Sequence, residues 1–277
     1  AKKMLEEEGI YVPMITTLHG TDITLVGKHP FYKPAVTFSI NQSDVVTSVS
    51  ESLKQGTLET FDIQGDIEVI PNFIDAKKYS TSFTDCQRSN MATEEERIVT
   101  HISNFRKVKR IPDVIKIFSK IQLEIPSKLI MVGEGPEKAG AERLCEELGI
   151  SDKVIFLGNS NEIDKILCFS DLFLLPSQSE SFGLAALEAM INKVPVISSN
   201  AGGIPEVNTE GVSGFLSDVG DINDMASKAI TILKNDNVLE RFKLNALKEA
   251  QRFDIQKVVP LYEEVYVRAY NGRLKNV

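Results

Sequence analysis

Two glutamates eight positions apart, Glu180 and Glu188, are the residues of this sequence best placed to act together on one ligand. Residues 171–177 form a short apolar run closed by Pro and Ser, which is typical of a buried strand. Residues 183–192 are rich in Leu, Ala, Glu and Met, which favour a helix. Glu180 is therefore expected in the loop between this strand and this helix.

The predicted start of that helix, between Ser181 and Gly183, is suited to bind a phosphate. A helix N-terminus offers unpaired N–H groups and a partial positive charge. Gly183 lets a ligand approach the backbone where a Cβ would block it. Glu188 lies one turn after Leu184, so both carboxylates can face the same ligand. The spacing alone equally permits a loop charge and a solvated helix face.

Composition places the chain among globular proteins with room for about two domains. Of the 277 residues, 42% are hydrophobic and 25% charged, and the formal net charge of −8 argues against a nucleic-acid partner. No apolar run approaches the roughly 20 residues of a membrane span, and no signal peptide is visible. We therefore expect a cytoplasmic protein with neither nucleic acid nor membrane as a partner.

The first part of the chain alternates strand-like and helix-like segments. Residues 1–9 resemble the end of a helix, and the strand predicted at 12–18 runs into the polar cluster His19-Gly20-Thr21-Asp22. Ligands of open α/β sheets bind at this end of the strands, although a lone His is as often structural. Further strands are predicted at 44–50 and 67–73, with helices at 31–42 and 51–61. This alternation predicts a parallel sheet with right-handed crossovers.

A second α/β series follows a polar segment, residues 76–96, which we interpret as an interdomain connection. Its predicted strands lie at 98–105, 128–132, 154–157, 172–175, 194–198 and 214–217. Its clearest helices are predicted at 113–123, 137–148, 222–233 and 238–250. Apolar residues at helical spacing predict a last helix at 258–270.

Four cations, Arg106, Lys107, Lys109 and Arg110, follow the first strand of this second series. Charge clusters are commonly solvated, but the carboxyl end of a strand favours anion binding here. The next strand leads into Gly133-Glu134-Gly135, which matches the first two glycines of the dinucleotide-binding fingerprint G-x-G-x-x-G. The third glycine position is Lys138, so the fingerprint is not fulfilled. Gly202-Gly203 is another tight loop after a strand, and fits a structural turn as well as a ligand contact.

The Glu180 to Glu188 stretch resembles the E-x7-E signature of the retaining nucleotide-sugar glycosyltransferases of family 4. The resemblance covers almost the whole chain and implies an α/β GT-B architecture of two facing Rossmann-like domains. It also implies that the N-terminal domain is incomplete here, with roughly its first half outside this sequence. The implied organisation is the C-terminal part of the acceptor domain at 1–75, the connection at 76–96, the nucleotide-sugar domain at 97–254, and a helix crossing back at 255–277.

The family resemblance also assigns roles to individual residues. Glu180 would face the donor sugar, Glu188 would bind the ribose hydroxyls, and Lys109 would contact the diphosphate. The family's Arg position is Asn104 here, and Arg106 lies two residues later. His19, Lys109, Arg106 and Glu180 are the candidate catalytic residues, and His19 would line the sugar. The candidate nucleotide-sugar contacts are Ser103, Asn104, Gly133, Gly135, Ser181, Phe182, Gly183, Leu184 and Glu188. The candidate acceptor contacts are Thr16, Thr17, Gly20 and Thr21.

One subgroup of this family fits best, the enzymes that join N-acetylglucosamine to L-malate in the first step of bacillithiol biosynthesis. We therefore expect UDP-N-acetylglucosamine as donor and L-malate as acceptor. No cofactor and no metal are expected, because the sequence contains no Asp-x-Asp pair to bind one against the diphosphate. Other GT-B enzymes, such as a non-hydrolysing 2-epimerase or a transferase with another acceptor, stay open, as does a non-catalytic nucleotide-binding module. A homo-oligomer is compatible with the sequence.

Overall fold

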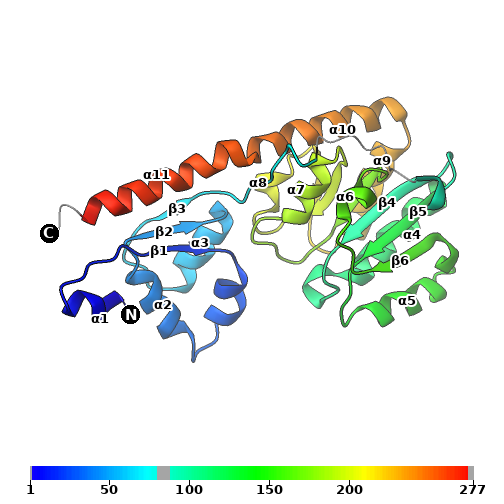
Figure 1. Cartoon of the computed structure of the whole chain (residues 1–277). Helices are drawn as coiled ribbons and strands as arrows, with labels where there is room; N and C mark the ends of the chain where they lie inside the picture. Colours follow the sequence, from blue (N-terminus) through cyan, green and yellow to red (C-terminus); the bar gives the residue numbers. More distant parts are fainter. Residues whose placement is uncertain (1, 80–87, 274–277) are drawn as a thin grey trace. The chain divides into compact units, whose positions relative to one another are not determined.

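Two parallel sheets organise the chain in a computed structural model, which describes residues 2–79 and 88–273. Each sheet lies in its own compact unit (Figure 1). Unit 1 comprises Ala1–Phe73 and Phe253–Val277, and unit 2 comprises Ile74–Arg252. Residues 80–87 of the predicted connection lie outside the described residues.

Unit 1 contains a three-stranded parallel sheet in the order β1-β2-β3. Its strands are β1 (Ile15–Leu18), β2 (Val45–Ser48) and β3 (Ile67–Val69). Its first helices are α1 (Lys2–Glu7), the π-helix η1 (Asp22–Gly27), α2 (Lys33–Asn41) and α3 (Glu51–Thr60). The alternation predicted from the sequence is confirmed. A π-helix begins three residues after His19, which the sequence pattern did not indicate.

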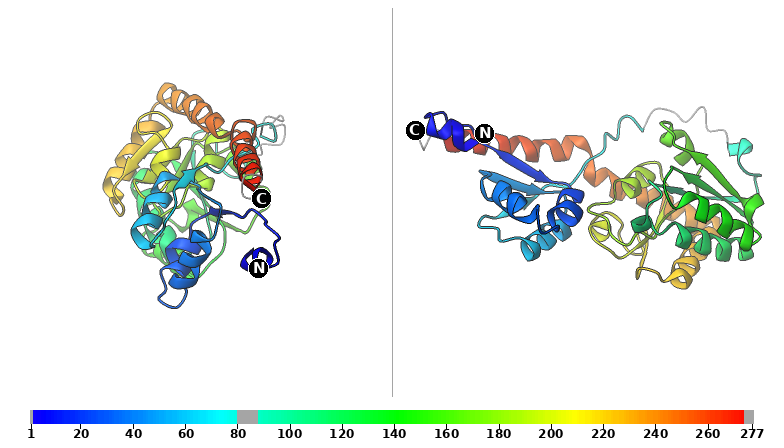
Figure 2. Two further views of the ribbon diagram at one scale, coloured as in Figure 1. Left: turned by 90° about the vertical axis from the view of Figure 1, so that its left-hand side faces the viewer. Right: turned by 90° about the horizontal axis from the view of Figure 1, so that it is seen from below.

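The last helix of the chain, α11 (Ile255–Arg273), belongs to unit 1. Val258 and Val265 are buried in a cluster with Ile70, the residue that follows β3. Arg268 pairs with Glu68 on β3. The helix predicted from the apolar spacing at 258–270 is therefore present, and its apolar face packs on this sheet. Figures 1 and 2 show α11 running beside the small sheet.

Unit 2 contains a six-stranded parallel sheet in the order β6-β5-β4-β7-β8-β9. This is the doubly wound order, in which the first strand pairs with both the second and the fourth. The strands are β4 (Arg97–Ile102), β5 (Ser127–Val132), β6 (Val154–Gly158), β7 (Leu172–Leu175), β8 (Val196–Ser199) and β9 (Gly214–Ser217).

Helices connect these strands and cover the sheet (Figure 1). They are α4 (Ile111–Glu124), α5 (Lys138–Glu147), α6 (Ile163–Leu167), α7 (Leu184–Ile191), α8 (Ile204–Val207), α9 (Ile222–Leu233) and α10 (Asp236–Ala250). Helices α4 and α9 share one buried apolar cluster with β4, β5 and β7. Helices α6 and α8 were not among the clearest predicted helices, because helices of five and four residues carry almost no periodic signal. Among the helices of residues 2–79 and 88–273, none combines the length and the apolar character of a membrane span.

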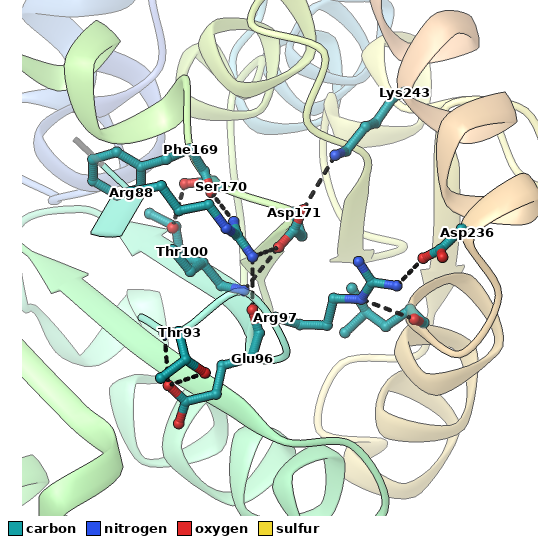
Figure 3. A network of polar contacts seen from close by, with 12 residues as sticks. Arg88, Thr93, Glu96, Arg97, Thr100, Phe169, Ser170, Asp171, Asp236 and Lys243 are labelled. Atoms are coloured by element: carbon teal, nitrogen blue, oxygen red, sulfur yellow. Dashed lines mark hydrogen bonds and ion pairs between the residues drawn. The ribbon is translucent and has the colours of Figure 1, made fainter. Parts of the chain in front are cut away.

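A buried carboxylate ties the amino end of the large sheet together (Figure 3). Asp171, just before β7, is 4% exposed and accepts a hydrogen bond of 3.0 Å from the backbone N–H of Ile98 on β4. Its oxygens also lie 3.0 Å from Arg88 Nη2 and 3.1 Å from Lys243 Nζ on α10. Asp171 therefore links two adjacent strands to α10 and to the segment that precedes β4.

We expect Asp171→Asn to lower the free energy of unfolding by about 3 kcal/mol, because it leaves two cations beside a neutral group in a buried place. The matched control is Asp236→Asn, which breaks the pair of Asp236 with Arg97 at a side chain that is 81% exposed. The loss in free energy of unfolding of this control should stay below about 1 kcal/mol. Since the chain has no Trp, urea unfolding is followed by far-ultraviolet circular dichroism. Equal losses for both variants would contradict a structural role for Asp171.

Candidate active site

The candidate site lies where the strand order of unit 2 reverses. Strands β4 and β7 are neighbours, with Val99 opposite Leu172 and Thr100 opposite Phe173. The chain leaves these two strands in opposite directions along the sheet. In open α/β sheets ligands bind outside the carboxyl ends of the strands at such a point, and this place is called the crevice below. The loop after β4 carries the four predicted cations, and the loop after β7 carries Glu180.

An ion pair joins these two loops. Lys109 Nζ lies 2.6 Å from Glu180 Oε1, and the two side chains are 20% and 14% exposed. The hydroxyl of Ser177 donates to the same oxygen at 2.8 Å. Within the described ranges, no hydrogen bond is made by the other oxygen, Oε2. Glu180 is thus held through one oxygen while the other stays available to a ligand.

The four cations of the β4 loop have different surroundings. Residues Lys107–Lys109 form a 3-10 turn that directs Lys109 toward Glu180. Arg110 pairs with Asp113 in the first turn of α4. Arg106 and Lys107 are exposed, and neither pairs with an acidic side chain in the described part of the chain. The structure thus places Lys109 against Glu180 and leaves Arg106 exposed, and the roles of both in anion binding stay predictions.

The loop that carries Glu180 packs against the backbone of Gly202 and Gly203. Gly203 donates its N–H to the carbonyl oxygen of Glu180 at 2.9 Å. A Cβ on Gly202 would lie 2.0 Å from that oxygen, and one on Gly203 would lie 2.4 Å from the carbonyl oxygen of Ser181. The structural interpretation of this pair of glycines is therefore supported: they hold the Glu180 loop through close backbone contact.

The loop of Gly133 and Gly135 makes the same kind of contact with the β4 loop. A Cβ on Gly133 would lie 1.8 Å from the carbonyl oxygen of Ser103, and one on Gly135 would lie 2.6 Å from that of Phe105. Both have positive φ, at 128° and 159°. The two glycines thus pack against the backbone of Ser103 and Phe105, and Asn104 between them is exposed.

Helix α7 begins directly after the Glu180 loop. Gly183 is its N-cap with φ of 103°, a conformation that side chains rarely adopt. Phe182 is 2% exposed and anchors the loop in the core, whereas Leu184 is exposed at the first helical position. The first N–H groups of a helix lack partners within it, so this turn, flanked by Ser181, can face an anion. The predicted start between Ser181 and Gly183 is correct to within one residue.

Glu188 occupies a different environment from Glu180. Its side chain is half-buried, and within residues 2–79 and 88–273 no hydrogen bond to its carboxylate is formed. Burial raises the pKa of Glu188 above its usual value, and the nearby Asp164 raises it further. A carboxylate that has lost water and gained no donor is ready to accept ligand hydroxyls.

The predicted sugar-facing and acceptor residues belong to unit 1. His19, at the carboxyl end of β1, is exposed, and Gly20 and Thr21 follow it toward the π-helix. Thr16 pairs with Ser43 at 2.7 Å, and Ser43 donates onward to the carbonyl of Ser39. The proton of Thr16 is therefore committed to Ser43.

Thr17 differs from Thr16 in its hydrogen bonding. Its hydroxyl oxygen accepts a hydrogen bond of 2.9 Å from the Thr47 hydroxyl, so the Thr17 proton remains available for a hydrogen bond to a ligand. The roles assigned to His19, Thr16, Thr17, Gly20 and Thr21 stay predictions.

Sequence reasoning did not single out two polar residues of this site. Ser177 was interpreted only as the end of a strand, although its place three residues before Glu180 makes it a natural partner for that carboxylate. His101, the fifth residue of β4, was not noted, yet it is fully buried beside the crevice and bonds both Leu174 and Ser103. Its signal in the sequence was a single His within an apolar strand.

Comparisons with known proteins identify the family of this chain. The family model of Glycosyl transferases group 1 matches residues 83–249, and that of Glycosyltransferase Family 4 matches residues 9–78. The N-acetyl-alpha-D-glucosaminyl L-malate synthase of Bacillus anthracis is 42% identical over 268 residues, which cover 96% of this chain and 70% of the synthase. This identity confirms the family resemblance inferred from the sequence.

More distant proteins are also similar to this chain. The 2-deoxystreptamine N-acetyl-D-glucosaminyltransferase of Niallia circulans is 26% identical over 283 residues, covering 95% of this chain and 71% of that enzyme. The crystal structure of HepE from Anabaena, in complex with UDP and glucose, superposes with a TM-score of 0.82 at 24% identity. That match covers 92% of this chain and 71% of HepE, and it confirms the predicted GT-B fold class.

We expect Gly202→Ala to lower the free energy of unfolding by about 3 kcal/mol, because its Cβ forces the Glu180 loop to move in addition to the backbone strain. Gly211→Ala is the matched control, since φ is 60° at Gly202 and 71° at Gly211 but the control position has open space. That control should lose only about 1 to 2 kcal/mol from left-handed strain. Urea unfolding measures both variants, and indistinguishable losses would show that close contact with Glu180 is unimportant.

Proposed function

This chain belongs to the group 1 glycosyltransferases, and we propose that it transfers N-acetylglucosamine from UDP-N-acetylglucosamine to the hydroxyl of L-malate. The identity to the malate synthase supports the choice of sugar and acceptor. The observation that carries the proposed chemistry is the Lys109–Glu180 pair at the carboxyl ends of β4 and β7. This reaction would be the first step of bacillithiol biosynthesis, which we propose to take place in the cytoplasm.

Lys109 would bind the donor diphosphate. In the free protein its ammonium neutralises Glu180 at 2.6 Å, so the cation is already positioned in the crevice. Breaking the anomeric bond adds negative charge to the departing diphosphate. A cation fixed before the reaction stabilises this charge without reorganisation, and stabilises the transition state more than the ground state. Arg106 and the first turn of α7 would add to the same anion site.

Glu180 would orient the sugar through its free oxygen. Ser177 and Lys109 both bind Oε1, so this oxygen is occupied while Oε2 can accept from a sugar hydroxyl. When the diphosphate engages Lys109, Ser177 still holds the carboxylate in position. The two roles are therefore compatible in one bound state.

Glu188 would bind the ribose of the nucleotide. A ribose offers hydroxyl donors, and this half-buried carboxylate has a raised pKa. Donors to the ionised form favour it, so nucleotide binding should lower the pKa of Glu188 again. This makes Glu188 a binding residue shared by UDP and the UDP-sugar.

We propose that the transfer retains the anomeric configuration and needs no metal. The malate hydroxyl would attack the anomeric carbon on the face that the diphosphate leaves. One carbon–oxygen bond to UDP breaks as one to malate forms, and the departing diphosphate takes the hydroxyl proton. Support for metal independence comes from the sequence, which has no Asp-x-Asp pair and supplies Lys109 and Arg106 instead.

We expect Glu188→Gln to weaken UDP and UDP-N-acetylglucosamine binding alike by about tenfold or more, since hydrogen bonds to charged groups contribute roughly 1.5–3 kcal/mol. Glu180→Gln should leave UDP affinity near that of the wild type and lower kcat, because its ligand is the sugar. Calorimetry with UDP on both variants measures this difference. Equal losses of UDP affinity would refute the assignment of the two carboxylates.

The stability of the free protein provides a control for Glu188→Gln. A carboxyl group with a raised folded-state pKa destabilises the fold when ionised, so the Gln variant should be more stable than the wild type at pH 7. The difference should shrink as pH falls through the raised pKa and vanish below the unfolded value of about 4.3. A variant that loses both UDP affinity and stability would indicate misfolding.

Product analysis tests the proposed reaction. The intact protein is incubated with UDP-N-acetylglucosamine with and without L-malate, and products are identified by mass spectrometry. We expect UDP and N-acetylglucosaminyl malate to appear together only when malate is present, and to persist in EDTA. UDP release that ignores malate would remove the acceptor assignment. UDP binding without turnover would favour a nucleotide-binding module, and epimerised donor would favour an epimerase.

A further inference from the structure

A buried histidine contacts the candidate site without a role in the chemistry proposed above. His101 on β4 is 0% exposed, and both of its ring nitrogens have partners. Nδ1 lies 2.8 Å from the carbonyl oxygen of Leu174 near the end of β7, and Nε2 lies 2.7 Å from Ser103 Oγ. The ring also stacks on Phe173, with centroids 6.4 Å apart.

These partners decide which nitrogen carries the proton. A carbonyl oxygen can only accept, so Nδ1 must donate to Leu174. Burial, together with the positive charge of nearby Lys109, lowers the pKa of His101 to about 4, so the ring is neutral at pH 7. A neutral imidazole has one N–H, and Nε2 is therefore an acceptor.

The hydroxyl of Ser103 must then donate to His101. A serine has one proton and two lone pairs, and that proton is committed to Nε2. The backbone fixes Ser103 in this place, because its N–H donates to the carbonyl of Val132 at 3.1 Å and Gly133 packs against its carbonyl oxygen. Toward the crevice, Ser103 Oγ can offer only lone pairs.

Phosphate oxygens are acceptors at neutral pH and need donors. Ser103 has no proton to give them, although it follows the strand whose loop carries Lys109 and Arg106. We propose that His101 is a positioning residue that makes Ser103 an obligate hydrogen-bond acceptor, so that Ser103 binds an O–H or N–H group of the donor substrate and no phosphate oxygen. This inference rests on the proposed use of a UDP-sugar.

The proton arrangement is measured first, on the ligand-free protein. Long-range proton–nitrogen correlation spectra of 15N-histidine-labelled protein distinguish the two neutral tautomers. The chain has three histidines, His19, His29 and His101, so single substitutions of the exposed His19 and His29 assign the signals. We expect the His101 signal to show a protonated Nδ1 and a bare Nε2 throughout pH 6 to about 8. A protonated Nε2 overturns the inference whatever the substrate is.

The ligand group is identified by comparing three ligands on Ser103→Ala. UDP, UDP-N-acetylglucosamine and inorganic diphosphate are titrated by calorimetry, the last also in competition with UDP. We expect the affinity for UDP-N-acetylglucosamine to fall about three- to tenfold, the value of one neutral hydrogen bond, with diphosphate unchanged. If the affinity for UDP falls equally, the O–H or N–H group that Ser103 binds belongs to the nucleoside. If only the affinity for the UDP-sugar falls, that group belongs to the sugar.

The matched control is Ser170→Ala, which removes a buried hydroxyl bonded to Thr100 at 2.6 Å, before β7 and away from the crevice. It should leave all affinities unchanged. A weaker affinity of Ser103→Ala for diphosphate, or unchanged affinity for every ligand, overturns the inference. Failure of the wild-type protein to bind UDP would instead overturn the proposed function, and the tautomer measurement separates these two results.

Discussion

The candidate site depends on the ion pair between Lys109 and Glu180. The two residues lie 71 positions apart in the chain, and they meet because β4 and β7 are neighbours at the reversal of strand order. Both side chains are largely buried, so water and salt screen their attraction less than at the surface. A nucleotide-sugar offers each of them a new partner, since the diphosphate is an anion and the sugar carries hydroxyl donors. The ion pair thus keeps both side chains positioned and neutralised until the ligand binds and gives each of them a new partner.

Close backbone packing holds the loops that carry this pair. Gly202 and Gly203 contact the Glu180 loop, and Gly133 and Gly135 contact the loop that leads to Lys109. In each case a Cβ would lie closer than van der Waals distance to a carbonyl oxygen, so a side chain would push the loop away. The glycines next to the site are therefore required because they lack a side chain.

Two carboxylates of unit 2 differ in their hydrogen-bond and ion-pair partners, and this difference separates a structural role from a binding role. Asp171, before β7, has two cations and a backbone N–H around it, and it holds strands and helix together. Glu188, on the helix after β7, has none of these among the described residues, and its pKa is raised by burial. A buried charge that the protein itself satisfies supports the fold, whereas one that is left unsatisfied is available to a ligand.

The sequence by itself determined the α/β alternation, the position of Glu180 in a strand-to-helix loop, the start of α7 and the placement of cations after β4. These features depend on local periodicity, on helix-forming residues and on the rule that ligands bind at the carboxyl ends of parallel strands. Only the tertiary structure decided which groups meet. It paired Lys109 with Glu180, placed Ser177 on the same oxygen, and committed the protons of His101, Ser103 and Thr16. Such choices follow from strand order and from distances between loops far apart in the chain, and no local pattern encodes them.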